Sequence, residues 1–353
     1  RAQVGDPPDE RLPERASRME DVDLVYTWCD SADPVWNARR LATMKAFDLV
    51  QDPTANAACR YAANDELRYS LRSAERCVPW VRRVFLVIAD DATPPKWLRP
   101  GYPKLQIVRL GEILPDPSKP CFCSDAIEHR LAFIPGLSER YLLSNDDTFF
   151  ARPLSPGFFY TRDGYPVFRF GGERKPSGTA AYPTYIRMIE NAVGLVREAF
   201  GGHCAHDLEK AFVRYPHHNV DAYVKSDVLD AYGRYARAIT PMYDYPFRRP
   251  EHVQRVLYAY DAIARGHGRF RLARFRVKET RPWWKRLLRP GYADSLQFFG
   301  EGWREGPEML RRWKPGLFCF NDTEAATDED RAWLRQTMES LFPERSSFEK
   351  EGA

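Results

Sequence analysis

The sequence predicts an α/β protein built around a mostly parallel sheet. Short β-rich apolar segments alternate with segments of helical spacing through the first half, and polar or acidic residues follow several of the strand-like segments. The clearest strand-like segment, "RYLLSNDD" at 140–147, ends in Asn145, Asp146 and Asp147. Strands that alternate with helices form parallel sheets, and such sheets bind ligands beyond the carboxyl ends of their strands. We therefore expect the acidic strand ends to converge on one edge.

The first half supplies most of the predicted sheet. The expected strands are apolar and rich in β-branched residues, and they lie at 23–28, 82–91, 104–110 and 140–147. The expected helices show apolar residues at helical spacing, and they lie at 35–50, 64–78 and 124–134.

The second half has a different pattern. A glycine-bearing loop is followed by two long segments of helical spacing, which predict a helical insertion over the strand ends; the three segments are 171–180, 182–202 and 219–239. An alternating strand-like segment, a late strand that returns to the sheet and a closing helix follow, at 269–280, 316–322 and 328–342. We expect Asp328 to cap the closing helix.

These patterns predict the domain organisation. Residues 1–20 are polar, charged and proline-bearing, and predict a flexible leader. Residues 21–353 are predicted to form a single catalytic domain. Its α/β core comprises 21–165 and 310–350, and the mainly helical insertion on the acceptor side comprises 166–309.

Composition narrows the class of protein. The chain has 353 residues, 44% of them hydrophobic, which is enough for a large core. A net charge of +4 suits anionic small substrates such as nucleotides and is too weak to indicate nucleic-acid binding. No segment approaches the roughly 20 apolar residues that span a bilayer, and the seven scattered cysteines do not predict a disulfide framework. We expect a cytoplasmic protein.

One basic segment qualifies that expectation. "RPWWKRLLRP" at 281–290 combines paired tryptophans with basic residues. It could contact an anionic membrane surface or a lipid-linked acceptor peripherally, or it could be a packed loop.

The triplet Asn145-Asp146-Asp147 predicts a metal site. Adjacent carboxylates repel one another and lose hydration beside a core, and a divalent cation would offset both costs. Mg²⁺ and Mn²⁺ prefer oxygen ligands and bridge carboxylates to phosphates. The alternative is an Asx turn with both side chains in water. Asn321-Asp322 repeats the pattern after a second apolar segment.

The exit of the first strand, "YTWCDSADP" at 26–34, predicts a nucleotide pocket. Tyr26 or Trp28 could stack on a base, and Thr27 and Asp30 could form hydrogen bonds with it. The alternative is a capped turn before a helix.

Two arginines share one face of the helix predicted at 64–78. Arg68 and Arg72 lie four residues apart and could hold phosphate oxygens. The alternative is surface ion pairing with Asp65 and Glu75.

Candidate general bases occur in two further segments. Glu128 in "SDAIEHR" could be a metal ligand or a base, and the neighbouring His129 is expected at the surface. The paired His217 and His218 in "YPHHNVD" are expected at the start of a helix. Histidine has a pKa near neutrality and suits deprotonation of an acceptor hydroxyl; the alternative is an exposed cap.

Four segments taken together resemble the Stealth family. They are "DVDLVYTWCDSADPVW", "NDELRYSLRSAERCVPWVRRVFLV", "SDAIEHRLAFIPGLSERYLLSNDDTFFARPL" and the terminal "FCFNDT" with "FPERSSFEK". That family contains bacterial capsule and exopolysaccharide sugar-1-phosphate transferases and the catalytic subunit of the lysosomal-enzyme GlcNAc-1-phosphotransferase. The resemblance implies a nucleotide-binding sheet similar to GT-A and Rossmann-like glycosyltransferases. It also implies Mg²⁺ or Mn²⁺, a UDP-sugar donor such as UDP-GlcNAc, and transfer of hexose-1-phosphate to a hydroxyl of a glycan or another acceptor, with release of UMP.

The resemblance also assigns roles to residues. The residues that match the family's acidic and metal-binding blocks are Glu128, Asp146, Asp147 and Asp322. Its essential histidine falls on the His217–His218 pair, where we assign the base to His218, and its essential arginine falls on Arg248 or the neighbouring Arg249. Asn145, His217 and Arg249 are assigned to substrate binding. Cys29 stands where the family usually has a small aliphatic residue.

These assignments define a mechanism and its rivals. His218 would accept the acceptor proton, with Asp147 or Glu128 as the alternative base, and Arg248 would neutralise phosphoryl oxygens. A metal-dependent glycosyltransferase would instead attack the anomeric carbon and release UDP, and a non-catalytic module would bind the UDP-sugar without turnover. The sequence leaves open the sugar, the acceptor and the oligomeric state.

Overall fold

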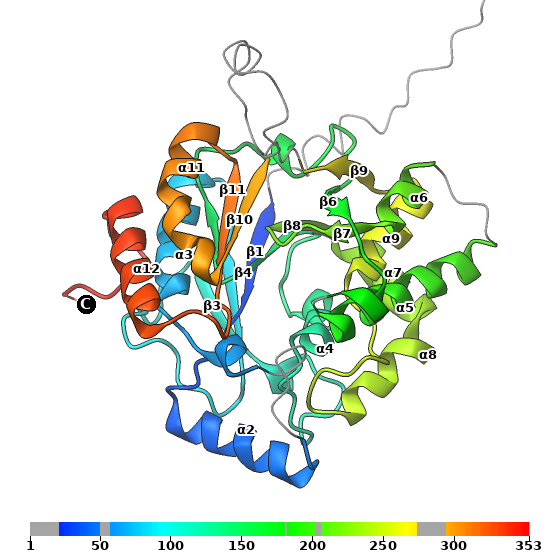
Figure 1. Cartoon of the computed structure of the whole chain (residues 1–353), viewed down its shortest axis with the longest axis horizontal. Coiled ribbons are helices and arrows are strands. Elements are labelled where there is room, and N and C mark those ends of the chain that lie inside the picture. Colours follow the sequence, from blue (N-terminus) through cyan, green and yellow to red (C-terminus); the bar gives the residue numbers. More distant parts are fainter. Residues whose placement is uncertain (1–20, 50–56, 181, 202–205, 274–293, 353) are drawn as a thin grey trace, which may run out of the picture.

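The computed structural model describes residues 21–49, 57–180, 182–201, 206–273 and 294–352. Within these residues the largest sheet has five strands in the order β3-β2-β1-β4-β8 (Figure 1). Its parallel strands are β1 (Val22–Thr27), β2 (Val84–Ile88), β3 (Leu105–Arg109) and β4 (Arg140–Asn145). Strand β8 (Asp221–Val224) runs antiparallel to β4 at the sheet edge. The predicted α/β fold with a mostly parallel sheet is confirmed.

Two helices of the first half lie close to their predicted positions, whereas the one expected at 124–134 ends at Glu128 and is followed by a 3-10 turn at Leu131–Phe133. The helices are α2 (Pro34–Ala46), α3 (Glu66–Cys77) and α4 (Ser124–Glu128). Helix α2 begins where Asp33 accepts hydrogen bonds from the backbone N–H groups of Val35 and Trp36, with Pro34 at the first helical position. The closing helix α12 (Asp328–Leu341) is capped by Thr327 rather than Asp328, because the Thr327 hydroxyl accepts a hydrogen bond from the backbone of Asp330 and the Asp330 carboxylate bonds back to Thr327.

The late strand does not return to the large sheet. Strand β11 (Leu317–Asn321) pairs in parallel with β10 (Ser295–Phe299) and antiparallel with β5 (Thr148–Phe150), and helix α11 (Gly306–Trp313) lies between β10 and β11 in the chain. The prediction of a strand at 316–322 is confirmed, but its sheet is different. Asp146 and Asp147 form the turn between β4 and β5, and the backbone N–H of Phe320 in β11 donates to the carbonyl oxygen of Asp147 at 3.0 Å, so β11 lies next to the end of β4.

The range predicted as a mainly helical insertion, 166–309, contains both helices and strands. Its helices gather on one side of the large sheet (Figure 1), and they are α5 (Pro183–Ala199), α6 (His206–Phe212), α7 (Lys225–Arg234), α8 (Ala236–Ile239) and α9 (Val256–Ala264). Among the described residues it also contains a three-stranded sheet of β7 (Arg214–Pro216), β6 (Val167–Glu173) and β9 (Arg269–Leu272).

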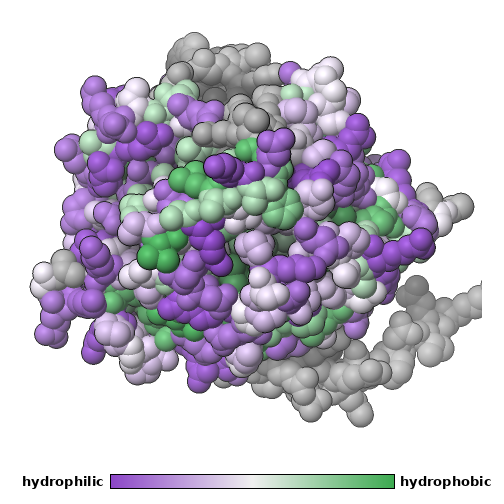
Figure 2. Space-filling model, turned by 90° about the horizontal axis from the view of Figure 1, so that it is seen from below, coloured by the Kyte–Doolittle hydropathy of each residue, from purple (hydrophilic) through white to green (hydrophobic). Residues whose placement is uncertain are grey.

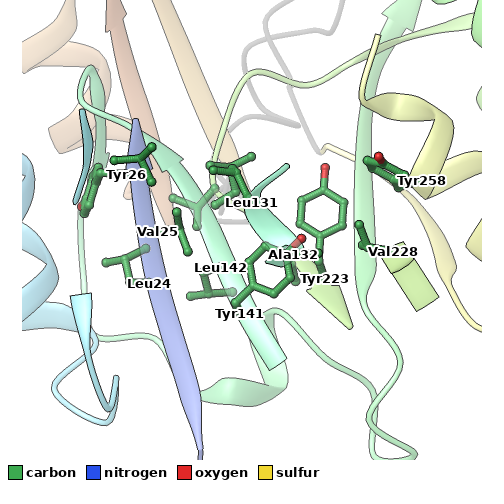
Figure 3. Close-up of a cluster of buried hydrophobic side chains, with 14 of the residues drawn as sticks. Leu24, Val25, Tyr26, Leu131, Ala132, Tyr141, Leu142, Tyr223, Val228 and Tyr258 are labelled. Atoms are coloured by element: carbon green, nitrogen blue, oxygen red, sulfur yellow. The ribbon is translucent and has the colours of Figure 1, made fainter. Parts of the chain in front are cut away.

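The helix expected at 219–239 begins with strand β8 instead. Tyr223 of β8 lies in register with Tyr141 of β4, and their rings stack with centroids 5.5 Å apart (Figure 3). Such a cross-strand aromatic pair stabilises strand pairing over local helix propensity. His217 and His218 consequently lie in the loop between β7 and β8, not at the start of a helix.

The core lies between the large sheet and its helices. Buried side chains of β1, β4 and β8 pack there with residues near α4, α7 and α9; Figure 3 labels Leu24, Val25, Tyr26, Leu131, Ala132, Tyr141, Leu142, Tyr223, Val228 and Tyr258. The Tyr160 hydroxyl lies 2.9 Å from the carbonyl oxygen of Tyr141 in β4 and 3.1 Å from that of Tyr223 in β8. Tyr160 therefore contacts both strands.

The surface carries apolar side chains mainly in separate patches. On the face shown in Figure 2, hydrophilic side chains cover most of the area. None of the described helices combines the length and the apolar composition needed to cross a bilayer. The predicted leader at 1–20 and the basic segment at 281–290 lie outside the described residues.

Candidate active site

A cavity of about 1010 Å³ lies beyond the carboxyl ends of β1 and β4. Thr27 and Asn145, the last residues of these strands, lie in register and both line it. The cavity brings together most of the predicted site residues, namely Thr27, Trp28, Glu128, Asn145, Asp146, Asp147, His217, His218, Arg248 and Asp322. Segments from both halves of the chain therefore meet at the edge that the strand ends indicated.

Asp147 and His218 form the centre of the cavity's polar network. His218 Nε2 lies 3.1 Å from Asp147 Oδ1, and Asp147 Oδ2 accepts hydrogen bonds from Asn321 Nδ2 at 3.0 Å and Cys319 Sγ at 3.3 Å. Burial opposes charge on Asp147, but His218 and the hydrogen bonds hold the pKa of that carboxyl below its ordinary value. Burial likewise opposes charge on His218, and Asp147 nevertheless raises the pKa of the imidazole.

Asp146 and Glu66 are two further carboxylates of the cavity lining whose charges influence each other. Burial, Glu66 and Asp147 together raise the pKa of Asp146 well above its ordinary value. Burial raises the pKa of Glu66 to about 7, although Asn64 Nδ2 donates to Glu66 Oε1 at 2.8 Å. Clustered oxygen ligands that resist ionisation without a counter-charge fit a hard divalent cation. Glu66 was not predicted, because on the first turn of α3 it resembles an ordinary acidic helix start.

Asp322 reaches the same cavity with its charge already balanced. Its Oδ2 lies 2.9 Å from Arg331 Nε and 3.4 Å from Asn64 Nδ2, and its Oδ1 accepts the backbone N–H of Thr323 at 2.7 Å. The three carboxylates predicted to bind metal therefore line one cavity, and Asp322 would have to share its oxygens between Arg331 and an ion.

Two arginines of the cavity lining, the partly buried Arg248 and the buried Arg255, pair with carboxylates from α4 and β8. Arg248 Nη2 lies 2.6 Å from Asp125 Oδ2. Arg255 bridges two acids, with Nη1 2.9 Å from Glu128 Oε2 and Nη2 2.8 Å from Asp221 Oδ2. Burial raises the pKa of Glu128, although Arg255 opposes that change. Asp125, Asp221 and Arg255 were not predicted as site residues, because no local sequence pattern pairs them with residues so distant in the chain.

His217 is buried behind His218. Its Nδ1 lies 3.3 Å from Asn219 Nδ2, and burial together with the His218 charge lowers the pKa of His217 to about 3. His217 is therefore neutral near pH 7, which leaves His218 as the member of the pair whose charge Asp147 supports.

Some predicted substrate-binding residues lie outside the cavity lining. Tyr26 is fully buried in the core and its hydroxyl lies 2.8 Å from Ser70 Oγ, so it cannot stack on a base. Asp30 accepts the backbone N–H of Ala32 at 2.8 Å, as in the capped-turn alternative. Arg249 stacks on Tyr245, with its guanidinium carbon 3.8 Å from the ring centroid.

Arg68 and Arg72 are also placed away from the cavity. Arg68 Nε lies 2.6 Å from Glu349 Oε2, and Arg72 Nε lies 2.8 Å from Glu349 Oε1. The ion-pairing alternative therefore describes this geometry, with Glu349 as the partner instead of Asp65 or Glu75.

The expectation that His129 lies at the surface is wrong. His129 is buried, and its Nδ1 atom lies 2.7 Å from the Tyr258 hydroxyl.

The fold is that of an α/β protein with a cavity beyond the carboxyl ends of its parallel strands. Nucleotide-binding α/β proteins bind their ligands at this position. The model of Stealth protein conserved region 2 matches residues 60–168, and that of conserved region 4 matches residues 308–353. The chain belongs to the Stealth family. Glu128, Asp146 and Asp147 lie in the first matched region and Asp322 in the second, whereas His218 and Arg248 lie outside both.

Curated relatives extend the similarity across the chain. The chain is 30% identical to the exopolysaccharide phosphotransferase CpsY of Mycobacterium tuberculosis over 344 residues, which are 96% of this chain and 60% of that protein. It is 32% identical to an exopolysaccharide phosphotransferase of Streptomyces coelicolor over 352 residues, 98% of this chain and 53% of that protein. The chain thus spans between half and two thirds of the length of these relatives.

Solved structures give a more distant likeness. The galactosyltransferase LgtC, solved in complex with donor and acceptor sugar analogs, aligns with a TM-score of 0.42 and 9% identity, covering 93% of this chain and 98% of that one.

Proposed function

We propose that the chain transfers sugar-1-phosphate from a UDP-hexose, such as UDP-GlcNAc, to an acceptor hydroxyl and releases UMP. The observation that carries the proposal is the Asp147–His218 pair, 3.1 Å apart in a cavity that also holds Asp146 and Arg248. The names of the relatives as exopolysaccharide phosphotransferases support the reaction class. The acceptor is a hydroxyl of a glycan. Because the transferred phosphate keeps its bond to the donor sugar and gains one to the acceptor oxygen, the product is a phosphodiester.

His218 acts as the general base. In the neutral tautomer that donates its Nε2 hydrogen to Asp147, the lone pair on Nδ1 accepts the proton of the acceptor hydroxyl. Asp147 then stabilises the imidazolium that forms, as a carboxylate does in hydrolytic triads. The resulting oxygen nucleophile attacks the β-phosphorus, and the bond from phosphorus to the UMP oxygen breaks while the anomeric bond stays intact.

Arg248 stabilises the transferring phosphoryl group. Asp125 and Ser124 hold its Nε and Nη2 atoms, and its Nη1 makes no hydrogen bond to another residue of the described ranges. A guanidinium that is fixed on one side retains donors for phosphoryl oxygens on the other. Mg²⁺ or Mn²⁺ held by Asp146, Asp147 and Asp322 would neutralise the pyrophosphate and the charge on departing UMP.

Identification of the released nucleotide tests the proposal. The chain is incubated with a panel of nucleotide sugars, Mg²⁺ or Mn²⁺ and a glycan acceptor, and the nucleotide product is identified by mass. UMP together with a phosphodiester supports the proposal. UDP identifies a glycosyltransferase instead, and donor binding without any product identifies a binding module; either result refutes phosphotransfer.

A further inference from the structure

Two side chains of the cavity lining and one buried side chain behind them combine a carboxylate, an imidazole and a thiol. One donor atom from each of Asp147, His218 and Cys319 lies within 4.8 Å of the other two. We propose that these residues form a binding site for a thiophilic divalent cation such as Zn²⁺. The donor set differs from the oxygen-only set assigned above to Mg²⁺ or Mn²⁺, with which it shares only Asp147.

The spacing of the donors suits a tetrahedral ion. Bonds of ~2.0 Å from zinc to nitrogen and ~2.3 Å to sulfur place neighbouring tetrahedral ligands roughly 3.3–3.7 Å apart. In this chain His218 Nε2 lies 3.1 Å from Asp147 Oδ1, and Cys319 Sγ lies 3.3 Å from Asp147 Oδ2. Small side-chain rotations would therefore place all three around one ion, and Asp147 and His218 line the cavity from which the ion would enter.

The surrounding structure holds the ligands in place. Cys319 lies opposite Thr148 in the β11–β5 pair, and the backbone N–H of Phe320 donates to the carbonyl oxygen of Asp147 at 3.0 Å. The side-chain amide of Gln297 donates to the carbonyl oxygen of His218 at 2.8 Å. These contacts fix the backbone that carries the ligands. Asn321 Nδ2 donates to Asp147 Oδ2 at 3.0 Å, and an outer hydrogen bond of this kind orients a ligating side chain.

The ligand chemistry selects the ion. Thiolate and imidazole favour Zn²⁺ and other borderline ions, whereas Mg²⁺ gains little from sulfur. Binding to the neutral form releases the Cys319 thiol proton to solvent and moves the His218 ring proton from Nε2 to Nδ1. That shift removes the Nδ1 lone pair, so Zn²⁺ would inhibit transfer; this consequence rests on the proposed function, whereas the binding itself does not.

Spectroscopy with Co²⁺ in place of Zn²⁺ tests the site on the whole chain. We expect one equivalent of Co²⁺ to produce a sulfur-to-cobalt charge-transfer band in the near ultraviolet. Cys319→Ser should abolish the band, whereas the control Cys29→Ser, which replaces a cysteine of the cavity lining, should retain it. No band in the wild type, or a band that survives Cys319→Ser, would overturn the proposal.

Because Cys319 is buried, Cys319→Ser could lose the band through misfolding, and a second variant tests the site independently. His218→Gln keeps the thiol, and it should weaken Zn²⁺ binding measured by calorimetry at least about tenfold, with an unchanged circular dichroism spectrum. Unchanged affinity would contradict the assignment of His218 as a ligand. If no UMP is released but the cobalt band depends on Cys319, the proposed function is wrong and the metal site stands. If UMP is released but the cobalt band does not depend on Cys319, only the metal site is rejected.

Discussion

The Nε2 atom of His218 lies 3.1 Å from Oδ1 of Asp147, although 71 positions separate the two residues in the chain. Asp147 belongs to the turn between β4 and β5, and His218 to the loop between β7 and β8. The antiparallel pairing of β8 with β4 brings the two segments together at the sheet edge. The pairing of β8 with β4 therefore brings the candidate base next to its carboxylate partner.

Replacing the candidate base should suppress turnover. His218→Gln is expected to lower kcat for UMP release by about 10²–10⁴, because the acceptor proton loses its recipient, with little change in the KM for the nucleotide sugar. The matched control is His267→Gln, since His267 pairs with Asp227 at 2.9 Å and does not line the cavity. Equal activity of His218→Gln and the wild type would remove His218 from the mechanism.

Removing one buried acid should separate stability from activity. Asp146→Asn is expected to raise the melting temperature of the protein in EDTA, because it relieves the repulsion from Glu66 and Asp147 that raises the pKa of Asp146. The same variant should require more Mg²⁺ or Mn²⁺ for UMP release. Differential scanning calorimetry and metal titrations measure the two effects, with the exposed Asp163→Asn as the control. A lower melting temperature in EDTA would show that the acidic cluster is not strained without metal.

Arg255 should be essential for the stability of the cavity wall. Arg255→Met leaves Glu128 and Asp221 without their shared partner, and breaking a buried ion pair costs on the order of 3–5 kcal/mol. Arg197→Met removes an exposed pair with Glu209 and should cost about 1 kcal/mol or less. Urea unfolding of both variants measures the difference. Similar losses in the two variants would contradict the structural role of Arg255.

Glu349 should contribute to stability in a defined pH range. Arg72 and Arg68, with the backbone of Ser346, outweigh burial and lower the pKa of Glu349 to about 2 from its ordinary 4.5. Its stabilising contribution is therefore complete above about pH 4.5 and is lost as the pH falls towards 2. Glu349→Gln should lower the melting temperature at neutral pH, and its melting temperature should fall less on acidification than that of the wild type. If the melting temperatures of both proteins fall by the same amount between pH 5 and about 2, this assignment is refuted.

Local sequence patterns were sufficient for the elements that one segment defines by itself. The strands around Val25, Leu86 and Leu142 were predicted because runs of β-branched and apolar residues bounded by polar ones are a local property. The same reasoning placed Asp146 and Asp147 beyond a strand end, where the structure has them.

Tertiary contacts decided the rest. The helix predicted around Tyr223 became a strand because a partner strand was available at the sheet edge, and pairing energy exceeded helix propensity. Arg72 was assigned to phosphate from its helix face alone, whereas its partner Glu349 lies 277 positions away.

By itself, the sequence determined the α/β class, the parallel strands and the carboxylates at their ends, because these follow from periodicity within single segments. Only the tertiary structure decided that Glu66 and Arg255 line the cavity with them and that Cys319 lies beside Asp147. Side chains from distant segments meet only after sheets pair and helices pack, and no local pattern encodes that meeting.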